Sequence, residues 1–219
     1  MPTSLQNVVY VTSSHFKAEE NRIFQENCDL EGTPIRDLFE FNIRAVPIVE
    51  LLEVDLCVMV QAEVTKAYSQ LKVPCIVEHA GLIFEDYLAA SYPGGLTKPM
   101  WNTLGDKFLE ETHSKGRRAV ARSVIAYCDG MSVHTFVGET EGTLADAPRG
   151  QRKFYWDTVF IPDDPTGNVK DMTYAEIVEN PSFGLKYKMV NLSQSSRAML
   201  KFLKYLKENG TSSLWNLGT

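Results

Sequence analysis

Several hallmarks of other protein classes are missing from this sequence. Its 219 residues include only four cysteines, which lie far apart without a C-x-x-C pair, so neither a zinc site nor a disulfide framework is indicated. We expect free thiols in a reducing compartment. Basic residues are outnumbered, 22 against 28 acidic ones, and the formal net charge is −6. Because nucleic acids and anionic membrane surfaces attract basic proteins, neither is an expected partner.

Long apolar segments are also missing. The longest apolar run, Leu56 to Val60, is far too short for a membrane span, and the N-terminal residues have neither the basic nor the apolar region of a signal peptide. We therefore expect a cytoplasmic protein. The hydrophobic share of 44% and the length are sufficient to bury a core without a metal or disulfide. With no repeat, low-complexity segment or linker, residues 1–219 are predicted to form a single domain.

The pattern that is present predicts an α/β protein. A β-branched strand over 8–12 leads through a polar loop into a helix over 16–25, a unit whose loop amides and helix N-terminus can receive phosphate oxygens. Apolar residues spaced three or four apart predict a second helix over 55–71. A short buried strand over 75–78 would carry Glu78 and His79 at its C-terminal end, where ligand-binding groups collect in α/β sheets.

Extended segments dominate the second half of the chain. Two of them, 118–128 and 131–137, flank Asp129-Gly130, which predicts a hairpin with a two-residue type I′ turn. A separate extended piece is expected over 143–145, before a loop. An apolar stripe between Leu192 and Leu206 predicts a C-terminal helix.

No single catalytic template is present. The phosphate loop G-x-x-x-x-G-K-[ST], the dinucleotide motif G-x-G-x-x-G, the nucleophile motif G-x-S-x-G and the metalloprotease motif H-E-x-x-H are all missing. The residues with useful chemistry are scattered, and only a fold can bring them together.

Short motifs nevertheless follow one another in a recognisable order. They are V-T-S-S-H-F-K at 11–17, V-E-H-A-G-L at 77–82, Y-P-G at 92–94 with Lys98, F-V-G-E-T-E-G at 136–142 before A-P-R-G at 147–150, F-Y-W-D-T-V-F at 154–160, and T-Y-A-E at 173–176. In this order they resemble the inosine triphosphate pyrophosphatases, which remove pyrophosphate from non-canonical purine nucleotides such as ITP, dITP and XTP. The resemblance covers roughly residues 7–206. It implies an elongated α/β domain with two lobes, a mixed sheet flanked by helices, and a nucleotide cleft between the lobes.

The same resemblance implies the residues of the site. The nucleotide would be bound by a set of polar, basic and aromatic residues: Thr12, Ser14, Lys17, Lys98, Arg149, Phe154, Trp156, Asp157, Gln194 and Ser195. Within this set, Phe154 is expected to face the base, whereas Trp156 is expected to pack in the core. Glu50 and Glu53 are alternative ligands for magnesium, and Glu78 and His79 are the catalytic candidates.

This sequence departs from the family pattern at the metal and base positions. His79 stands where the family has an aspartate, and imidazole suits zinc, copper or nickel better than magnesium. His79 is therefore open to three interpretations: a polar residue without a catalytic task, a general base, or a ligand of another metal. Glu63 aligns with a lysine, and the base-reading S-H-R aligns with Ser193-Gln194-Ser195. The upstream family lysine aligns with Met189, one position from Lys188.

These departures favour a receptor over an enzyme, because they retain groups that grip a purine nucleotide and lose the metal position. Our first hypothesis is a catalytically impaired sensor of dITP or ITP that regulates a partner. The resemblance extends to sensor subunits of anti-phage systems, which implies an effector such as a sirtuin-like NADase. The alternative hypothesis is an active magnesium-dependent pyrophosphatase that converts ITP, dITP or XTP to the monophosphate. A third hypothesis is a structural subunit. A homodimer or an effector complex is expected, with apolar residues near Met100 and Trp101 as the interface.

Overall fold

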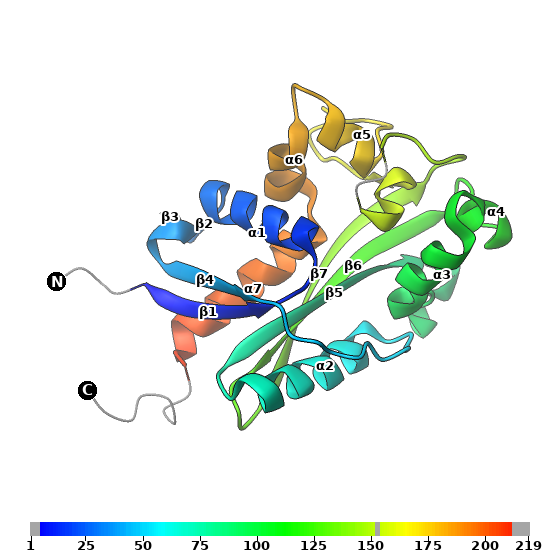
Figure 1. The fold of residues 1–219 in the computed structure, drawn as a ribbon. Coiled ribbons are helices and arrows are strands. Elements are labelled where there is room, and N and C mark those ends of the chain that lie inside the picture. Colours follow the sequence, from blue (N-terminus) through cyan, green and yellow to red (C-terminus); the bar gives the residue numbers. More distant parts are fainter. Residues whose placement is uncertain (1–4, 152–153, 212–219) are drawn as a thin grey trace, which may run out of the picture.

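The computed structural model describes residues 5–151 and 154–211, in which one mixed six-stranded sheet runs through the molecule (Figure 1). The strand order is β4-β1-β5-β6-β7-β8; β1 is parallel to β4 and β5, and the remaining pairs are antiparallel. The strands are β1 (Gln6–Val11), β4 (Phe39–Arg44), β5 (Cys75–Phe84), β6 (Arg118–Cys128), β7 (Val133–Leu144) and β8 (Phe160–Pro162). A small ribbon pairs β2 (Asp29–Leu30) with β3 (Thr33–Pro34). This arrangement confirms the predicted α/β class with a mixed sheet.

Helices cover both faces of this sheet. They are α1 (His15–Asn27), α2 (Leu56–Leu71), α3 (Thr97–Leu104), α4 (Phe108–Glu111), α5 (Tyr174–Glu179), α6 (Gly184–Tyr187) and α7 (Gln194–Asn209), and a π-helical turn (Lys188–Leu192) links α6 to α7. Figure 1 shows α2 along one face, with α1 and α7 on the other. The polar residues before the two long N-terminal helices act as caps: Ser14 accepts the amide of Lys17, and Asp55 accepts that of Cys57. Both helices predicted in the first half of the sequence are therefore confirmed.

The buried residues form separate clusters in the two halves of the molecule. Around β1, one cluster packs Tyr10 and Phe24 against α7, and another packs α2 on the opposite face of the sheet. At the far end of β5, Trp101, Phe108 and Trp156 form the centre of a third cluster. Burial of each such side chain contributes about 1.5–3 kcal/mol. The two halves thus have their own cores, and the cleft described below lies between them.

The β5 strand is longer than the sequence pattern predicts. It continues to Phe84, so Glu78 and His79 lie in the middle of the strand and not at its end. Gly81 permits this continuation, because a Cβ at this position would lie 2.1 Å from the carbonyl oxygen of Gly94, which crosses the strand there. The glycine of the V-E-H-A-G-L motif is therefore required for this close approach.

The hairpin is confirmed, but its turn differs from the predicted type. Cys128 pairs with Val133, so four residues connect the strands where two were expected. The Asp129 carboxylate accepts the amides of Met131 and Ser132 and closes this longer turn. The segment over 143–145 is not separate, since β7 runs unbroken to Leu144.

Of the two residues named for the predicted interface, Met100 and Trp101, Trp101 is not available at the surface. Trp101 is completely buried and packs against Phe108, with ring centroids 5.3 Å apart. Among residues 5–151 and 154–211, the helices lack the combination of length and apolar character that a membrane span needs.

Candidate functional site

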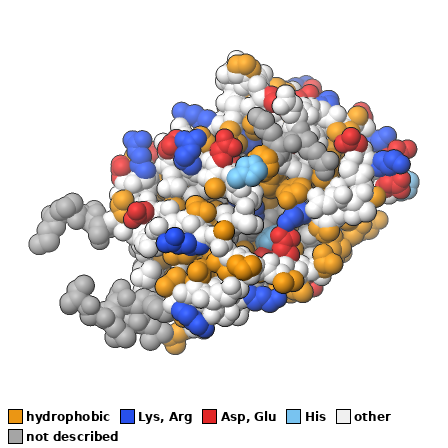
Figure 2. Space-filling model, viewed as in Figure 1, with side chains coloured by type: hydrophobic (Ala, Val, Ile, Leu, Met, Phe, Trp, Pro, Cys, Tyr) orange, Lys and Arg blue, Asp and Glu red, His pale blue; other side chains and the backbone are white. Residues whose placement is uncertain are grey.

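Two neighbouring cavities of different chemistry lie along α1. The first, which we call the polar cavity, has a volume of about 310 Å³ and is lined by the end of β1, the start of α1, the middle of β5 and Lys98 of α3. The second, the aromatic cavity, has a volume of about 230 Å³ and is lined by α1, Asp157, α5, α6 and Lys188. Phe16 and Phe154 line both, with ring centroids 6.4 Å apart in an edge-to-face arrangement. Figure 2 shows hydrophobic side chains in the hollow on this face, with charged groups beside them.

The loop between β1 and α1 forms one wall of the polar cavity. Thr12 Oγ1 accepts the amide of Ser14 at 3.1 Å, and Ser14 in turn caps the helix. Lys17 lies in the first turn of α1, where its Nζ donates to the backbone carbonyl of Glu78. The positive end of a helix and an ammonium group therefore face one cavity, an arrangement that attracts phosphate.

Glu78 is a buried carboxylate with a full set of protein partners. Tyr10 donates to it at 2.5 Å and Ser123 at 2.6 Å, and Ser195 adds another hydrogen bond. Burial alone raises the pKa of Glu78, but nearby Lys17 and these hydrogen bonds outweigh burial and hold the pKa below its usual range. Glu78 is thus charged and tied to the sheet. Burial of Tyr10 raises the pKa of its own hydroxyl, and the neighbouring negative charge of Glu78 raises that pKa further.

His79 and Glu63 form a pair across the interface between β5 and α2. The distance from His79 Nε2 to Glu63 Oε2 is 2.6 Å, and the Glu63 side chain is only 3% exposed. In the family pattern an aspartate stands at the position of His79 and a lysine at the position of Glu63. The acidic and basic members of the pair are therefore exchanged in this chain. Glu63 is held by His79 and does not face the cavity as an isolated charge.

The two proposed magnesium ligands have different environments. Glu50 lines the polar cavity and pairs with Lys98 at 2.6 Å. Burial opposes ionisation of Glu50, but Lys98 lowers its pKa overall. Glu53 lines neither cavity; its Oε1 accepts the amides of Val54 and Asp55 and closes the turn before α2. The structure therefore places Glu53 in the turn before α2, outside both cavities.

The described residues do not form a ready-made magnesium cage. In residues 5–151 and 154–211, no three His, Cys, Asp or Glu side chains are grouped in a metal-binding arrangement. The carboxylates at the polar cavity already have partners: Lys98 for Glu50, His79 for Glu63, and hydroxyl groups for Glu78. Because Mg²⁺ in nucleotide sites often takes one carboxylate with phosphate oxygens and water, Glu50 is the side chain that fits such a shared ion best.

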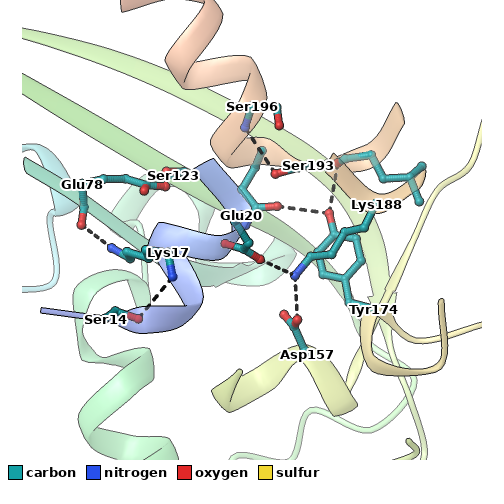
Figure 3. Close-up of polar contacts among 12 residues, drawn as sticks. Ser14, Lys17, Glu20, Glu78, Ser123, Asp157, Tyr174, Lys188, Ser193 and Ser196 are labelled. Atoms are coloured by element: carbon teal, nitrogen blue, oxygen red, sulfur yellow. Dashed lines mark hydrogen bonds and ion pairs between the residues drawn. The ribbon is translucent and has the colours of Figure 1, made fainter. Parts of the chain in front are cut away.

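The aromatic cavity contains a buried cation between two carboxylates (Figure 3). Lys188 Nζ lies 2.6 Å from Asp157 and 3.0 Å from Glu20, and it also lies 4.8 Å from the ring centroid of Tyr174. Burial alone would lower the pKa of Lys188, but the two carboxylates raise it. Burial raises the pKa of Asp157 to about 6, because Lys188 offsets the desolvation only in part. Asp157 Oδ1 has no hydrogen-bond partner in the described part of the chain.

Lys188 and Met189 are neighbours in the chain but point to different places. Lys188 begins the π-helical turn and donates to Asp157 in this cavity, whereas Met189 is buried in the cluster around β1 and α7. Lys188, one position from the aligned Met189, is therefore the residue that supplies an ammonium group to this cavity.

Some residues expected at the nucleotide lie away from both cavities. Trp156 is 1% exposed and packs against Phe160 and Tyr174, as expected of a core residue, so a contact with a ligand is not available to it. Gln194 is buried and accepts the hydroxyl of Tyr174. Both are held in place by packing of α7 and the aromatic cluster.

Arg149 and Ser195 also line neither of these two cavities. The Arg149 guanidinium donates to the carbonyl of Asp171 and lies 3.3 Å from Glu176, at the start of α5. Ser195 lines a small cavity of about 20 Å³ behind Lys17 and Glu78. The structure thus brings Thr12, Ser14, Lys17, Glu50, Glu78, His79, Lys98, Phe154 and Asp157 to the two cavities.

Phe16 and Glu20 are part of the site and were not predicted from the sequence. Both lie on α1 within one turn of Lys17, and Glu20 follows Lys17 by three residues on the same helix. Residues three or four apart share a helix face, so the position of Lys17 was the available signal.

This chain is similar to known proteins over more than nine tenths of its length. The Ham1 family profile matches residues 8–204. The dITP/XTP pyrophosphatase of Thermococcus kodakarensis is 28% identical over 92% of this chain and 98% of its own length. The inosine triphosphate pyrophosphatase of Candida glabrata is 29% identical over 91% of this chain and 96% of its own length. A solved HAM1 protein structure from Coxiella burnetii shares the fold, with a TM-score of 0.62 and 20% identity over 92% of this chain and all of that chain.

Proposed function

Because this chain belongs to the Ham1 family, we propose that it binds a purine nucleoside triphosphate in the cleft made by the two cavities. The base would occupy the aromatic cavity and the phosphates the polar cavity. The observation that carries this proposal is that the two cavities adjoin at Phe16 and Phe154, which line both, since a nucleotide likewise joins a flat ring to a string of anionic groups. Relatives named for dITP, XTP and inosine triphosphate support this class of ligand.

The groups in the aromatic cavity fit a purine with a carbonyl beside a ring N–H. Lys188 would donate to the carbonyl, and the unpartnered Asp157 Oδ1 would accept from the ring N–H. Phe154 is half-buried and offers a ring for stacking. Hypoxanthine, the base of ITP and dITP, presents this donor and acceptor side by side, whereas adenine presents them in the reverse order.

The polar cavity fits the phosphates. Lys17, Lys98 and the loop amides at the start of α1 supply donors and positive charge. Magnesium would accompany the triphosphate and take Glu50 as a protein ligand.

We further propose that the bound nucleotide is retained and hydrolysed slowly or not at all. The pairing of His79 with Glu63 supports this, because it leaves no free carboxylate at the position where the family pattern has an aspartate. Retention suits a cytoplasmic sensor that reports dITP or ITP to a partner. The partner would be a second copy of the chain or an effector such as a sirtuin-like NADase in anti-phage defence.

The second candidate function is an active pyrophosphatase for dITP, XTP or ITP. The names of the relatives favour it directly, because each of those quoted above is a pyrophosphatase. The two functions share the binding step and differ in whether pyrophosphate is released.

Titration of the purified protein with dITP and magnesium tests the shared step, and exchange of Lys17 for methionine tests the assigned phosphate cavity. Wild-type protein is expected to bind dITP in the micromolar range or tighter by calorimetry. Lys17→Met should weaken binding about 10- to 100-fold, because a charge-assisted bond to phosphate is lost. The exposed Lys66→Met on α2 is the matched control and should bind normally. Unchanged binding by Lys17→Met would overturn the phosphate assignment.

The same samples separate the two candidate functions. Pyrophosphate release over an hour, with dITP in excess, is measured beside the titration. Binding without release supports the sensor, whereas rapid turnover supports the pyrophosphatase and refutes retention. Absence of binding would contradict both.

Exchange of Glu50 for glutamine tests how this residue acts. In the absence of nucleotide, Glu50 competes for Lys98, so Glu50→Gln is expected to tighten magnesium-free dITP binding about threefold. Titrations are run with magnesium and with a chelator. If Glu50 is a metal ligand, the variant binds dITP no more tightly than the wild type when magnesium is present. A variant that binds more weakly in the chelator would contradict the competition with Lys98.

A further inference from the structure

The polar cavity has little positive charge to spare for a triphosphate. Among its described lining residues, carboxylates outnumber ammonium groups: Glu50, Glu63 and Glu78 stand against Lys17 and Lys98. Even a protonated His79 beside Glu63 would only balance these charges. Both lysines also have partners already, because Lys17 donates to a carbonyl of β5 and Lys98 pairs with Glu50. A strongly anionic triphosphate therefore gains from every further positive charge at this cavity.

His15 is a second histidine of this cavity, and its ring nitrogens have no protein partner within residues 5–151 and 154–211. It is the first residue of α1, is exposed to solvent and lies against Phe16, with ring centroids 3.9 Å apart. Imidazoles as a class gain or lose a proton between about pH 5 and 8. A bound anion can therefore decide the charge of such a group.

Charged groups of both signs surround His15. On α1, Lys17 follows it by two residues, and the exposed Glu19 follows it by four on the same helix face. The other titratable groups that line the cavity come from the segment before α2, from α2, β5, α3 and the turn at residue 155: Glu50, Glu63, Glu78, His79, Lys98 and Tyr155. All of these are present with and without a ligand. The arrival of phosphate is thus the change that adds negative charge near His15.

We propose that His15 binds an outer phosphate of the triphosphate and takes up a proton from solution when it does so. This inference rests on the proposed binding of a purine nucleoside triphosphate. The amides at the start of α1 and the Lys17 ammonium draw phosphates to the end of the helix that His15 begins. Phosphate stabilises the imidazolium, so binding and protonation favour each other. The contribution of His15 is therefore present at low pH and is lost as the pH rises.

Titrations of the full chain with dITP between pH 6.5 and 8.5 test the proposal. They are run in a chelator, so that magnesium does not compete with His15 for the phosphates. Over this range, the affinity of the wild type is expected to fall about fivefold more than that of His15→Asn. Calorimetry in two buffers of different ionisation enthalpy should show the wild type taking up about half a proton per dITP at pH 7.5, and His15→Asn clearly less.

Two further variants and a second ligand make the result specific. His113→Asn removes an exposed histidine that lines neither cavity, so it should keep the wild-type pH dependence. His15→Lys carries a positive charge throughout this pH range and should bind dITP more tightly than His15→Asn at pH 8.5. Deoxyinosine monophosphate lacks the outer phosphates, so its binding should have the same pH dependence in the wild type and in His15→Asn.

The outcomes separate this inference from the proposed function. Equal pH dependence of dITP binding in the wild type and His15→Asn would overturn the role of His15 and leave nucleotide binding intact. The same conclusion would follow if the two proteins took up equal amounts of proton, or if His15→Lys bound as weakly as His15→Asn at pH 8.5. Thermal melting verifies that each variant folds. If dITP does not bind to the wild type at all, the proposed function itself fails.

Discussion

Replacing Lys188 with methionine is expected to lower the free energy of unfolding by about 3–5 kcal/mol. The side chain is 4% exposed and lies within 3.0 Å of both Asp157 and Glu20. Removal of the ammonium leaves Asp157 buried with no opposite charge, and the aliphatic part of methionine replaces only the packing. Urea unfolding of the full chain measures the loss, which is a large part of the stability of a typical domain.

The neighbouring surface lysine provides the control for this prediction. Lys186 lies two residues earlier in α6 and is exposed, so Lys186→Met should change stability by less than about 0.5 kcal/mol. Asp157→Asn in the Lys188→Met background removes the unpaired charge and should recover part of the loss. A Lys188→Met protein as stable as the wild type would show that the buried ion pairs do not form.

Exchange of His79 for aspartate is expected to destabilise the protein by about 2–4 kcal/mol and to leave hydrolysis unrestored. The new carboxylate would face buried Glu63, whose Oε2 is now 2.6 Å from the imidazole, and two carboxylates at this distance repel each other. Restoring the family residue at one position is therefore insufficient. The second position must change with it.

The double variant Glu63→Lys with His79→Asp restores an opposite-charge pair in the reverse order. We expect it to recover at least half of the stability lost by the single aspartate variant, which corresponds to a coupling energy of about 1–3 kcal/mol. A double-mutant cycle that includes Glu63→Lys measures this coupling by thermal or urea unfolding. Additive effects would mean that the pair is not formed in solution.

The same variants test the proposed absence of turnover. The double variant places a carboxylate at position 79 and a lysine at position 63, as in the family pattern, so pyrophosphate release from dITP is expected to rise above the wild-type level. The single His79→Asp variant serves as the comparison. If both remain inactive but bind dITP, other departures, such as Ser195, account for the lack of hydrolysis.

The sequence pattern predicted those helices and turns that depend on interactions between residues close together in the chain. The polar cap before α1, the spacing of apolar residues in α2 and the turn residue Asp129 act through near neighbours in the chain. The full length of β5 was not predictable in this way, because its interior carries charged Glu78. That charge is tolerated through bonds from Tyr10 and Ser123, which are 68 and 45 residues away in sequence.

The candidate site shows the same division. Lys17, Phe154 and Asp157 reach the two cavities as expected, because they belong to short motifs with fixed spacing. Lys188 and Glu20 are 168 residues apart, and their contact requires the π-helical turn to pack against α1, which no sequence spacing indicates. Glu63 and His79 were each noted as unusual, but their pairing required the packing of α2 on β5.

The helix α1 carries groups for both parts of the ligand. Ser14 and Lys17 face the polar cavity, while Glu20 faces the aromatic cavity one turn later. A helix rises about 1.5 Å per residue and rotates about 100° with each, so an insertion in α1 would misplace both sets of groups together. A change of base preference that arises on α1 must therefore leave the length and register of this helix unchanged, because one helix positions the groups for both parts of the ligand.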